Sequence, residues 1–311
     1  MKKFIITVDT EGDNLWQWCP GDTITTENSL YIPRFQSLCE EFGFIPTYLT
    51  NYEMAMDQRW ISYGQSKASE QKCEIGLHIH AWNSPPEYQI ENRYGGNAYI
   101  TEYPEEVVAS KICFLKEQLE TRFETPIRSA RSGRWATGVS YFSALNSNGI
   151  LIDCSITPGI DLSGIPGKCV NQGNDYRSSQ TTPFFVYTDV REIPMTTRFV
   201  KWSGIGSPKK RLRSMVKGDA MWLRPFALSE KYLKVLTNRV EKEAECDYLE
   251  FMIHSSELMP GGSPYVKTPE ECERLFAVMK WYFDYVSTLG YEGISLYNYG
   301  EKLKDEKNEN S

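Results

Sequence analysis

The three histidines of this 311-residue chain each lie at the end of a short apolar run that is typical of a strand. His78 and His80 end one run, and His254 ends another. The first apolar run of the chain leads in the same way into two carboxylates, Asp9 and Glu11. Imidazole and carboxylate together are the common ligand set of a catalytic divalent metal ion. The sequence therefore predicts a metal-dependent hydrolase.

The spacing of these residues is as informative as their types. Asp9 and Glu11 are two residues apart, and so are His78 and His80. On an extended strand, this spacing places both side chains on the same face. In a parallel βα barrel, the carboxyl ends of the strands meet at one mouth. We therefore expect the two pairs and His254 to point at one centre.

The elements that must position these residues alternate between strand-like and helix-like runs, which indicates βα units and a mainly parallel sheet. The expected strands are residues 4–9, 45–50, 74–80, 127–132, 150–156, 191–196, 248–254 and 293–298. The expected helices are residues 28–42, 104–122, 138–148, 229–245 and 269–289. Seven or eight such units favour a (β/α) barrel related to the TIM barrel, with an open doubly wound sheet as the competing fold. No Gly-x-Gly-x-x-Gly motif follows the first strand, so a dinucleotide site is not expected there.

Two segments interrupt this alternation. We expect a single domain over residues 1–301, with long loops at about 157–190 and 198–227, and a frayed, charged tail over 302–311. The second loop contains a basic cluster, Lys209, Lys210, Arg211, Arg213 and Lys217. This cluster is either a solvated loop or a docking patch for a phosphate or an anionic membrane surface.

The composition excludes several classes of function. A net charge of −7 argues against general nucleic-acid binding, which needs a basic surface. No stretch approaches the ~20 apolar residues of a membrane span, and the first apolar run is too short for a signal peptide. The eight cysteines form no Cys-x-x-Cys pair, so a thiolate zinc site is not expected. We expect a soluble cytoplasmic protein with reduced thiols, whose 8 Trp and 19 Tyr suit contact with sugar rings.

Four motifs resemble, in their order, those of the NodB-type polysaccharide deacetylases (carbohydrate esterase family 4-like). They are Thr7-Val8-Asp9-Thr10-Glu11, Glu74-Ile75-Gly76-x-His78, Arg131-Ser132-Gly133-Arg134 and Ile253-His254-Ser255. The resemblance extends from residue 4 to about residue 300, and residues 78–86 resemble a subgroup associated with exopolysaccharide or lipopolysaccharide biosynthesis. It implies a distorted (β/α) barrel of seven or eight mainly parallel strands. It also implies a divalent metal ion that serves to remove an acetyl group from an N-acetyl sugar.

The resemblance implies catalytic roles for several positions. Asp9 matches the general base, Arg131 the arginine that orients this base, and His254 the general acid. The backbone N–H near Arg134 falls where the family has an oxyanion donor, and we expect Arg134 to contact substrate. Asp153, in the fifth expected strand, is a candidate for holding His254 in its charged form or for binding substrate.

The metal ligands implied by the resemblance require two substitutions of position. The family's second acid is commonly adjacent to the first, but Thr10 stands there, and Glu11 is the natural substitute because it lies on the same face of the strand. His78 matches the first imidazole ligand. The second usually follows four residues later, where this chain has Trp82, so His80 is the expected ligand and Trp82 a substrate contact. Zinc is the expected metal, with cobalt, nickel, manganese and iron left open.

The predicted function is removal of an N-acetyl group from an acetamido sugar of a glycan or glycan precursor, with a nucleotide- or lipid-linked saccharide as one form of the substrate. One alternative is a hydrolase of another amide, such as a cyclic imide or a ureide, on the same barrel. Another is a catalytically inactive carbohydrate-binding homologue, which the residues Thr10 and Trp82 motivate. A non-haem iron oxygenase shares the two-histidine, one-carboxylate set, but the parallel-barrel pattern disfavours it.

Overall fold

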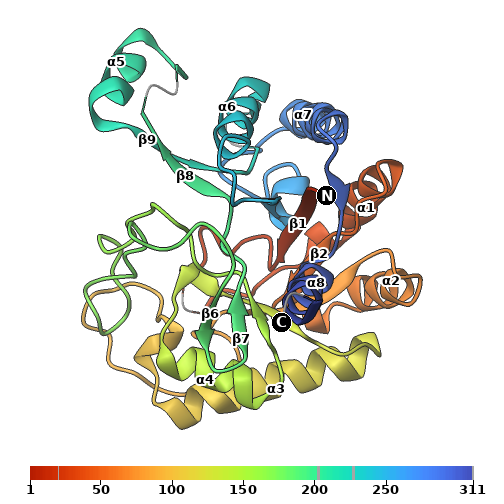
Figure 1. The fold of residues 1–311 in the computed structure, drawn as a ribbon. Helices are drawn as coiled ribbons and strands as arrows, with labels where there is room; N and C mark the ends of the chain where they lie inside the picture. The colour runs from red at the N-terminus through yellow and green to blue at the C-terminus, as the bar shows by residue number, and fades with distance from the viewer. Residues whose placement is uncertain (20, 202–203, 226–227, 310–311) are drawn as a thin grey trace.

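The computed structural model describes residues 1–311 except 20, 202–203, 226–227 and 310–311. Its main sheet has the strand order β10-β1-β2-β3-β4-β5-β7-β6, with β11 beside β1, and helices surround it (Figure 1). The strands are β1 (Lys3–Thr10), β2 (Thr47–Thr50), β3 (Glu74–Ile79), β4 (Ser129–Ser132), β5 (Ile152–Asp153), β6 (Phe184–Tyr187), β7 (Val190–Glu192), β10 (Tyr248–His254) and β11 (Glu292–Gly293). Every pair is parallel except β6 with β7. The expected distorted (β/α) barrel with mainly parallel strands is confirmed.

Three of the described α-helices begin at side chains that satisfy a free N–H group of their first turn. Asp57, Ser229 and Thr268 each accept a hydrogen bond from a backbone N–H in the first turn of the helix that follows. The α-helices are α1 (Ile32–Glu41), α2 (Gln58–Ser69), α3 (Glu105–Phe123), α4 (Val139–Ser147), α5 (Pro208–Lys217), α6 (Glu230–Val240), α7 (Pro269–Thr288) and α8 (Leu296–Glu309). Short 3-10 helices span Glu27–Leu30, Met54–Met56, Ile100–Glu102, Gly133–Trp135 and Ser255–Leu258. No helix in the described part of the chain is both long enough and apolar enough to cross a bilayer.

The register of the central strands brings distant polar residues together. Asp9 on β1 lies opposite His254 on β10, and His78 on β3 lies opposite Arg131 on β4. From Phe4 to its end, β1 is buried on both faces, as expected for a central parallel strand. The two-residue period therefore places alternate side chains of this strand inside the barrel.

The C-terminal segment differs from the prediction. Residues 293–298 were expected to form a strand, but β11 ends at Gly293 and α8 begins at Leu296. Leu296 and Tyr299, three positions apart, are both fully buried, which is the spacing of one helix face. α8 continues through Glu309 into the charged tail, and fraying of that tail stays a prediction.

Residues 198–227 also differ from the prediction of a loop. Their described part contains an antiparallel ribbon of β8 (Thr197–Val200) and β9 (Asp219–Trp222), connected through α5. Residues 202–203 and 226–227 of this segment lie outside the described residues. Thr197 and Met221, which lie on opposite faces of the ribbon, are both completely buried, so its base is covered on both sides. Residues 157–190 have little regular structure besides β6, as expected of a loop.

Candidate metal centre and active site

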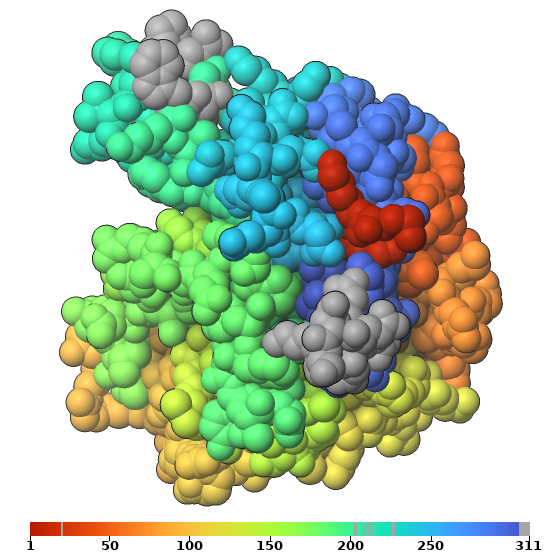
Figure 2. Space-filling view, in the orientation of Figure 1, coloured from red at the N-terminus to blue at the C-terminus, as the bar shows by residue number. Residues whose placement is uncertain are grey.

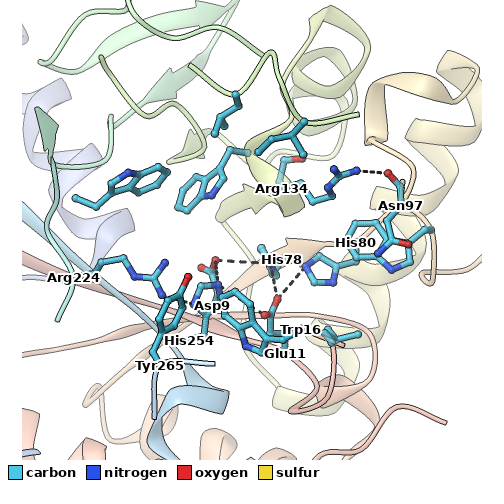
Figure 3. A pocket seen from close by; sticks show the side chains of 17 residues that line it. Asp9, Glu11, Trp16, His78, His80, Asn97, Arg134, Arg224, His254 and Tyr265 are labelled. Atoms are coloured by element: carbon cyan, nitrogen blue, oxygen red, sulfur yellow. Dashed lines mark hydrogen bonds and ion pairs between the residues drawn. The ribbon is translucent and has the colours of Figure 1, made fainter. Parts of the chain in front are cut away.

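Three predicted ligands converge at the carboxyl ends of β1 and β3. The Nε2 atom of His80 lies 3.0 Å from Oε2 of Glu11, and Nε2 of His78 lies 3.4 Å from the same oxygen. One donor atom from each residue lies within 4.8 Å of the others, and all three side chains are buried. Figure 3 shows the three side chains pointing toward one another at the bottom of a pocket. This group could hold a divalent metal ion.

The surroundings of the three side chains fit such an ion. His78 Nδ1 is 3.1 Å from the Arg131 carbonyl and donates to it, which leaves the Nε2 lone pair facing Glu11. His80 Nδ1 has no hydrogen-bond partner among the described residues, and its ring stacks on Trp82 with centroids 4.3 Å apart. Among the described ion pairs of Glu11, every partner is a histidine. A buried carboxylate with no Lys or Arg partner is a favourable place for a cation.

Burial and charge set the protonation of these groups. Burial raises the pKa of Glu11, but the charges of His80 and His254 outweigh it, and the pKa lies well below its ordinary value. Burial lowers the pKa of His80, so that ring keeps a free lone pair at neutral pH. Burial lowers the pKa of His78, but the charges of Asp9 and Glu11 outweigh burial, and the pKa lies above its ordinary value. Protons therefore compete with a metal ion for the Nε2 atom of His78.

Asp9 lies beside the metal group without belonging to it. Arg131 Nη1 donates to Asp9 Oδ1 at 2.6 Å, while Asp9 Oδ2 is 3.9 Å from His78 Nε2 and 3.8 Å from His254 Nε2. Burial raises the pKa of Asp9, but the charges of Arg131 and the two histidines outweigh it and hold the pKa below its ordinary value. One oxygen is thus fixed by the guanidinium, and the other faces the site.

Arg131 is completely buried, and each nitrogen of its guanidinium donates at least one hydrogen bond. Besides Asp9, it donates to the Cys154 carbonyl at 3.1 Å, to Thr7 Oγ1 at 3.0 Å and to Glu250. Glu250 was not expected from the sequence as part of the site. Burial raises its pKa to about 7 against the opposing charge of Arg131. The predicted pairing of Arg131 with Asp9 is thus present in the structure.

His254 is held by a carboxylate and an arginine that the sequence analysis missed. Its Nδ1 is 2.9 Å from Glu257 Oε1 and 3.0 Å from Arg224 Nη2, and Arg224 also donates to Glu257. Glu257 lies in the 3-10 helix that directly follows β10, and this turn brings its carboxylate beside the side chain of His254, three residues earlier in the chain. The position of Glu257 just after the His254 motif is the sequence feature from which its role could have been predicted. Arg224 follows β9 and gave no comparable signal.

Asp153 does not reach this site. It is completely buried on β5, where Tyr141 donates to it at 2.7 Å and Ser155 at 3.0 Å. It also neighbours Glu192, and burial raises the pKa of both carboxyls. The structure therefore does not bring Asp153 to His254 or to the pocket lining, and Glu257 is the carboxylate in contact with His254.

Above the polar cluster lies a cavity of about 480 Å³. The predicted contacts Trp82 and Arg134 both line it, and Arg134 donates to the main-chain carbonyls of Asn97 and, at 2.9 Å, Pro166. Further lining residues that the sequence did not single out are Trp16, Asn97, Trp135, Leu162, Ile165, Trp222 and Tyr265. Figure 2 shows the molecule hollowed between the loop that contains Leu162 and the β8–β9 ribbon. The pocket therefore has charged side chains at its bottom and aromatic side chains along its walls.

Comparison with solved structures gives the fold of the chain but not its family. A protein of Parabacteroides distasonis assigned as a glycoside hydrolase/deacetylase matches with a TM-score of 0.63 at 10% identity, covering 97% of this chain and 71% of that chain. The 4-alpha-glucanotransferase of Thermococcus litoralis matches with a TM-score of 0.51 at 10% identity, over 96% of this chain and 38% of that one. A protein of Mycobacterium smegmatis assigned as a polysaccharide deacetylase reaches 0.48 at 15% identity, over 94% and 93% of the two chains.

At these identities the first two matches establish a shared fold alone, and the third is too distant to add to it. No protein-family model matches the sequence, and no curated protein matches it. The fold is therefore one that carbohydrate-active proteins use, and function must be inferred from the site itself.

Proposed function

We propose that this protein is a metal-dependent hydrolase that removes an N-acetyl group from an acetamido sugar. The observation that carries the proposal is the convergence of Glu11, His78 and His80 with Asp9 and His254 on the floor of one pocket. Such a site contains a cation-binding group, a carboxylate base and an imidazole acid in contact range. These are the groups that amide hydrolysis by water requires.

Glu11, His78 and His80 would hold the metal ion, for which zinc is our choice, with cobalt, nickel, manganese and iron as alternatives. When bound, the ion would supply positive charge that acidifies water and polarises an amide carbonyl. His78 is fixed for this task by its hydrogen bond to the Arg131 carbonyl. Trp82 keeps the His80 ring in place by stacking on it.

Asp9 acts as the general base through Oδ2. Its Oδ1 atom is engaged by Arg131, so Oδ2 is the oxygen that faces the site and takes a proton from the attacking water. The same guanidinium keeps Asp9 ionised at neutral pH, because it stabilises the charged form. Arg131 thus both orients Asp9 and keeps it ionised.

His254 acts as the general acid through Nε2. Its other nitrogen, Nδ1, faces Glu257 and Arg224, so Nε2 points toward Asp9 and the pocket. A proton delivered from Nε2 to the amide nitrogen lets the amine leave when the carbon–nitrogen bond breaks. The products are acetate and the free amino sugar, which accounts for all atoms of water and amide.

The aromatic walls favour a sugar as the substrate. Trp16, Trp82, Trp135 and Trp222 all line the pocket, and flat indole faces suit the apolar faces of sugar rings. Within this proposal the saccharide is part of a glycan precursor, either nucleotide- or lipid-linked. We place the reaction in the cytoplasm, which fits the eight free thiols of the chain.

The test is an assay of acetate released from N-acetylated saccharides by purified protein loaded with zinc or cobalt. We expect acetate and free amine in equal amounts, and no acetate from chelated protein. If folded, metal-loaded protein releases no acetate from any N-acetylated saccharide, the deacetylase proposal is wrong. Release of product from a cyclic imide or a ureide would then identify the alternative amide hydrolase.

A further inference from the structure

The β8–β9 ribbon and α5, with the described residues 197–201 and 204–222, form an arm that projects from the barrel. Figure 1 shows α5 at the end of this arm, away from the main sheet and from the other labelled helices. The base of the arm is anchored, because Thr197 and Met221 are completely buried. Its outer end, in contrast, carries several exposed apolar side chains.

The apolar side chains of α5 face solvent. Leu212, Met215 and Val216 are 64%, 37% and 75% exposed, and their spacing places them on one side of the helix. Ser214 is completely buried, although it is polar. It lies two positions from Leu212 and from Val216, a rotation of about 200° on an α-helix. The side of the helix that carries Leu212, Met215 and Val216 is therefore turned outward, the reverse of an ordinary surface helix.

Phe199 on β8 extends this apolar surface toward the ribbon. Its side chain is 50% exposed. The ring lies so close to Gly218, the residue after α5, that a Cβ added to Gly218 would come within 2.3 Å of it. The ring and the helix end are thus neighbours. Scattered exposed apolar residues are common, but four at the end of one projecting arm mark an interaction surface.

The same segment carries concentrated positive charge. Residues 201–217 contain six Lys or Arg and no Asp or Glu, in a chain whose net charge is −7. Lys209 and Lys217, near the two ends of α5, have exposed side chains. A basic, amphipathic helix with an outward apolar side is the form that lies in the interface of an anionic membrane.

We propose that the arm docks this protein on an anionic lipid surface. Leu212, Val216 and Phe199 enter the headgroup region, and Lys209 and Lys217 pair with lipid charge, aided by the net positive charge of the segment. A nucleic acid would use the cations but leave the apolar side chains in water. A second copy of the chain would bring two basic arms together, which like-charge repulsion opposes. An anionic bilayer satisfies both features at once.

The arm also reaches the pocket. Trp222 ends β9, and both Trp222 and Arg224 line the cavity above the polar cluster. Docking of the arm therefore brings the mouth of the pocket near the lipid surface. Together with the proposed function, on which this step rests, it selects an acetamido sugar attached to a lipid carrier as the substrate.

The direct experiment is co-flotation of the full-length chain with vesicles, without metal or substrate. We expect binding to phosphatidylcholine vesicles containing about one third phosphatidylglycerol, weak binding to phosphatidylcholine alone, and release by salt. The double variant Leu212→Ser, Val216→Ser should bind at least about tenfold more weakly. Removing charge by Lys209→Gln and Lys217→Gln should weaken binding about fivefold for each lysine.

The chain offers a matched control. Val139, the first residue of α4, is 74% exposed, nearly equal to Val216, so Val139→Ser should leave vesicle binding unchanged. Circular dichroism establishes that each variant is folded. Equal binding to neutral and anionic vesicles, or full binding by the double serine variant, would overturn the proposal. So would a parent chain that ignores vesicles but binds an oligonucleotide or forms dimers through Leu212 and Val216.

Vesicle binding is measured without turnover, so its failure is distinct from failure of the deacetylase assay. If both proposals hold, the double serine variant lowers kcat/KM on a vesicle-embedded acetamido glycolipid and leaves kcat/KM on a water-soluble saccharide unchanged. Loss of turnover on both substrates would indicate damage to the pocket instead and would contradict docking as the role of the arm.

Discussion

The two parts of the pocket are constructed in different ways. The strand-built part comprises Asp9, Glu11, His78, His80 and His254, at or just beyond the ends of β1, β3 and β10. The loop-built part comprises Trp16, Arg134, Trp222, Arg224 and Tyr265, from connections and from the arm. Parallel pairing fixes the backbone under the first group, whereas the second depends on turns and on the position of the β8–β9 ribbon.

This difference indicates a division between chemistry and recognition. In the strand-built part, Asp9, Glu11, His78 and His80 are buried and face one another, the kind of preorganisation that can lower a barrier. In the loop-built part, Arg134 donates to main-chain carbonyls rather than to a carboxylate, and indole faces border open space. We therefore expect changes in the first part to lower kcat, and changes in the second to raise KM.

The largest effect should follow removal of a metal ligand. His78→Ala or His80→Ala should lower metal content to near zero and turnover to background, because a carboxylate and one imidazole hold a divalent ion weakly. Metal content per chain and the rise in Tm on adding zinc measure this without reference to activity. His254→Ala is the matched control and should keep its metal. Should His80→Ala bind metal as tightly as the parent, His80 is not a ligand.

The next effect should come from Asp9→Asn. The amide cannot accept the water proton, so kcat should fall by about 10³–10⁴-fold with metal content unchanged. Asp13→Asn is the control, because Asp13 is also buried after β1 but bonds to Thr25 and the Asn28 N–H outside the site. It should keep turnover within a few fold. An Asp9→Asn enzyme with nearly parental kcat would assign the base to another group.

A smaller effect should follow changes at the acid. His254→Ala should lower kcat by about 10²–10³-fold, and Glu257→Gln, which leaves the imidazole less firmly held, by about tenfold. Both losses should shrink on an aryl amide, whose amine leaves with less help from a proton. Glu257→Asp should recover part of the activity. Equal losses on aryl and alkyl amides would show that neither residue assists the leaving group.

The grouping of these residues could be predicted from the sequence because their arrangement follows from strand geometry. A period of two places Asp9 with Glu11, and parallel ends converge, so no tertiary detail was needed to group them with His254. Glu257 was missed because its role depends on a 3-10 turn that brings it back to His254. Asp153 was chosen for its place in a strand, but its oxygens bond to Tyr141 and Ser155 instead.

The fold was predictable where elements alternate and not where they depart from the βα repeat. The run around Leu296 favours a strand because Ile294 and Leu296 fit a period of two, whereas the burial of both Leu296 and Tyr299 in the structure fits the helix that forms there. The arm gave a signal of basic charge but no clear strand period. Its ribbon is short, and its outer helix has its apolar side chains exposed, so no buried apolar stripe marks it as a helix of the βα repeat.

Recognition by the loop-built part predicts a smaller, different effect for Trp222→Ala. Loss of an indole face should raise KM about tenfold and change kcat by less than about threefold, because the reacting groups lie on other elements. Steady-state kinetics on a soluble N-acetylated saccharide measures both constants. Trp281→Ala is the control, since Trp281 stacks on Tyr285 on α7 and does not line the cavity. A fall in kcat without a change in KM would remove the distinction between the two parts.

The last prediction, with the smallest effect on turnover, concerns stability and the charge balance beneath the strand-built part. Asp9 and Glu250 share one guanidinium, and burial raises the pKa of Glu250 from 4.5 to about 7. The folded chain therefore keeps a proton that the unfolded chain releases, so the free energy of unfolding should fall as pH rises from about 4.5 to 7, by roughly 3 kcal/mol from this group.

Glu250→Gln tests this balance, because the amide stays neutral and can still accept hydrogen bonds from Thr7 and Arg131. Urea unfolding at pH 5 and pH 8 should show a smaller loss of stability for the variant than for the parent, with kcat nearly unchanged. An identical loss in both proteins would mean that Glu250 ionises normally in the folded chain. Arg131 would then be paired with two fully ionised carboxylates, and its orientation toward Asp9 would depend on both.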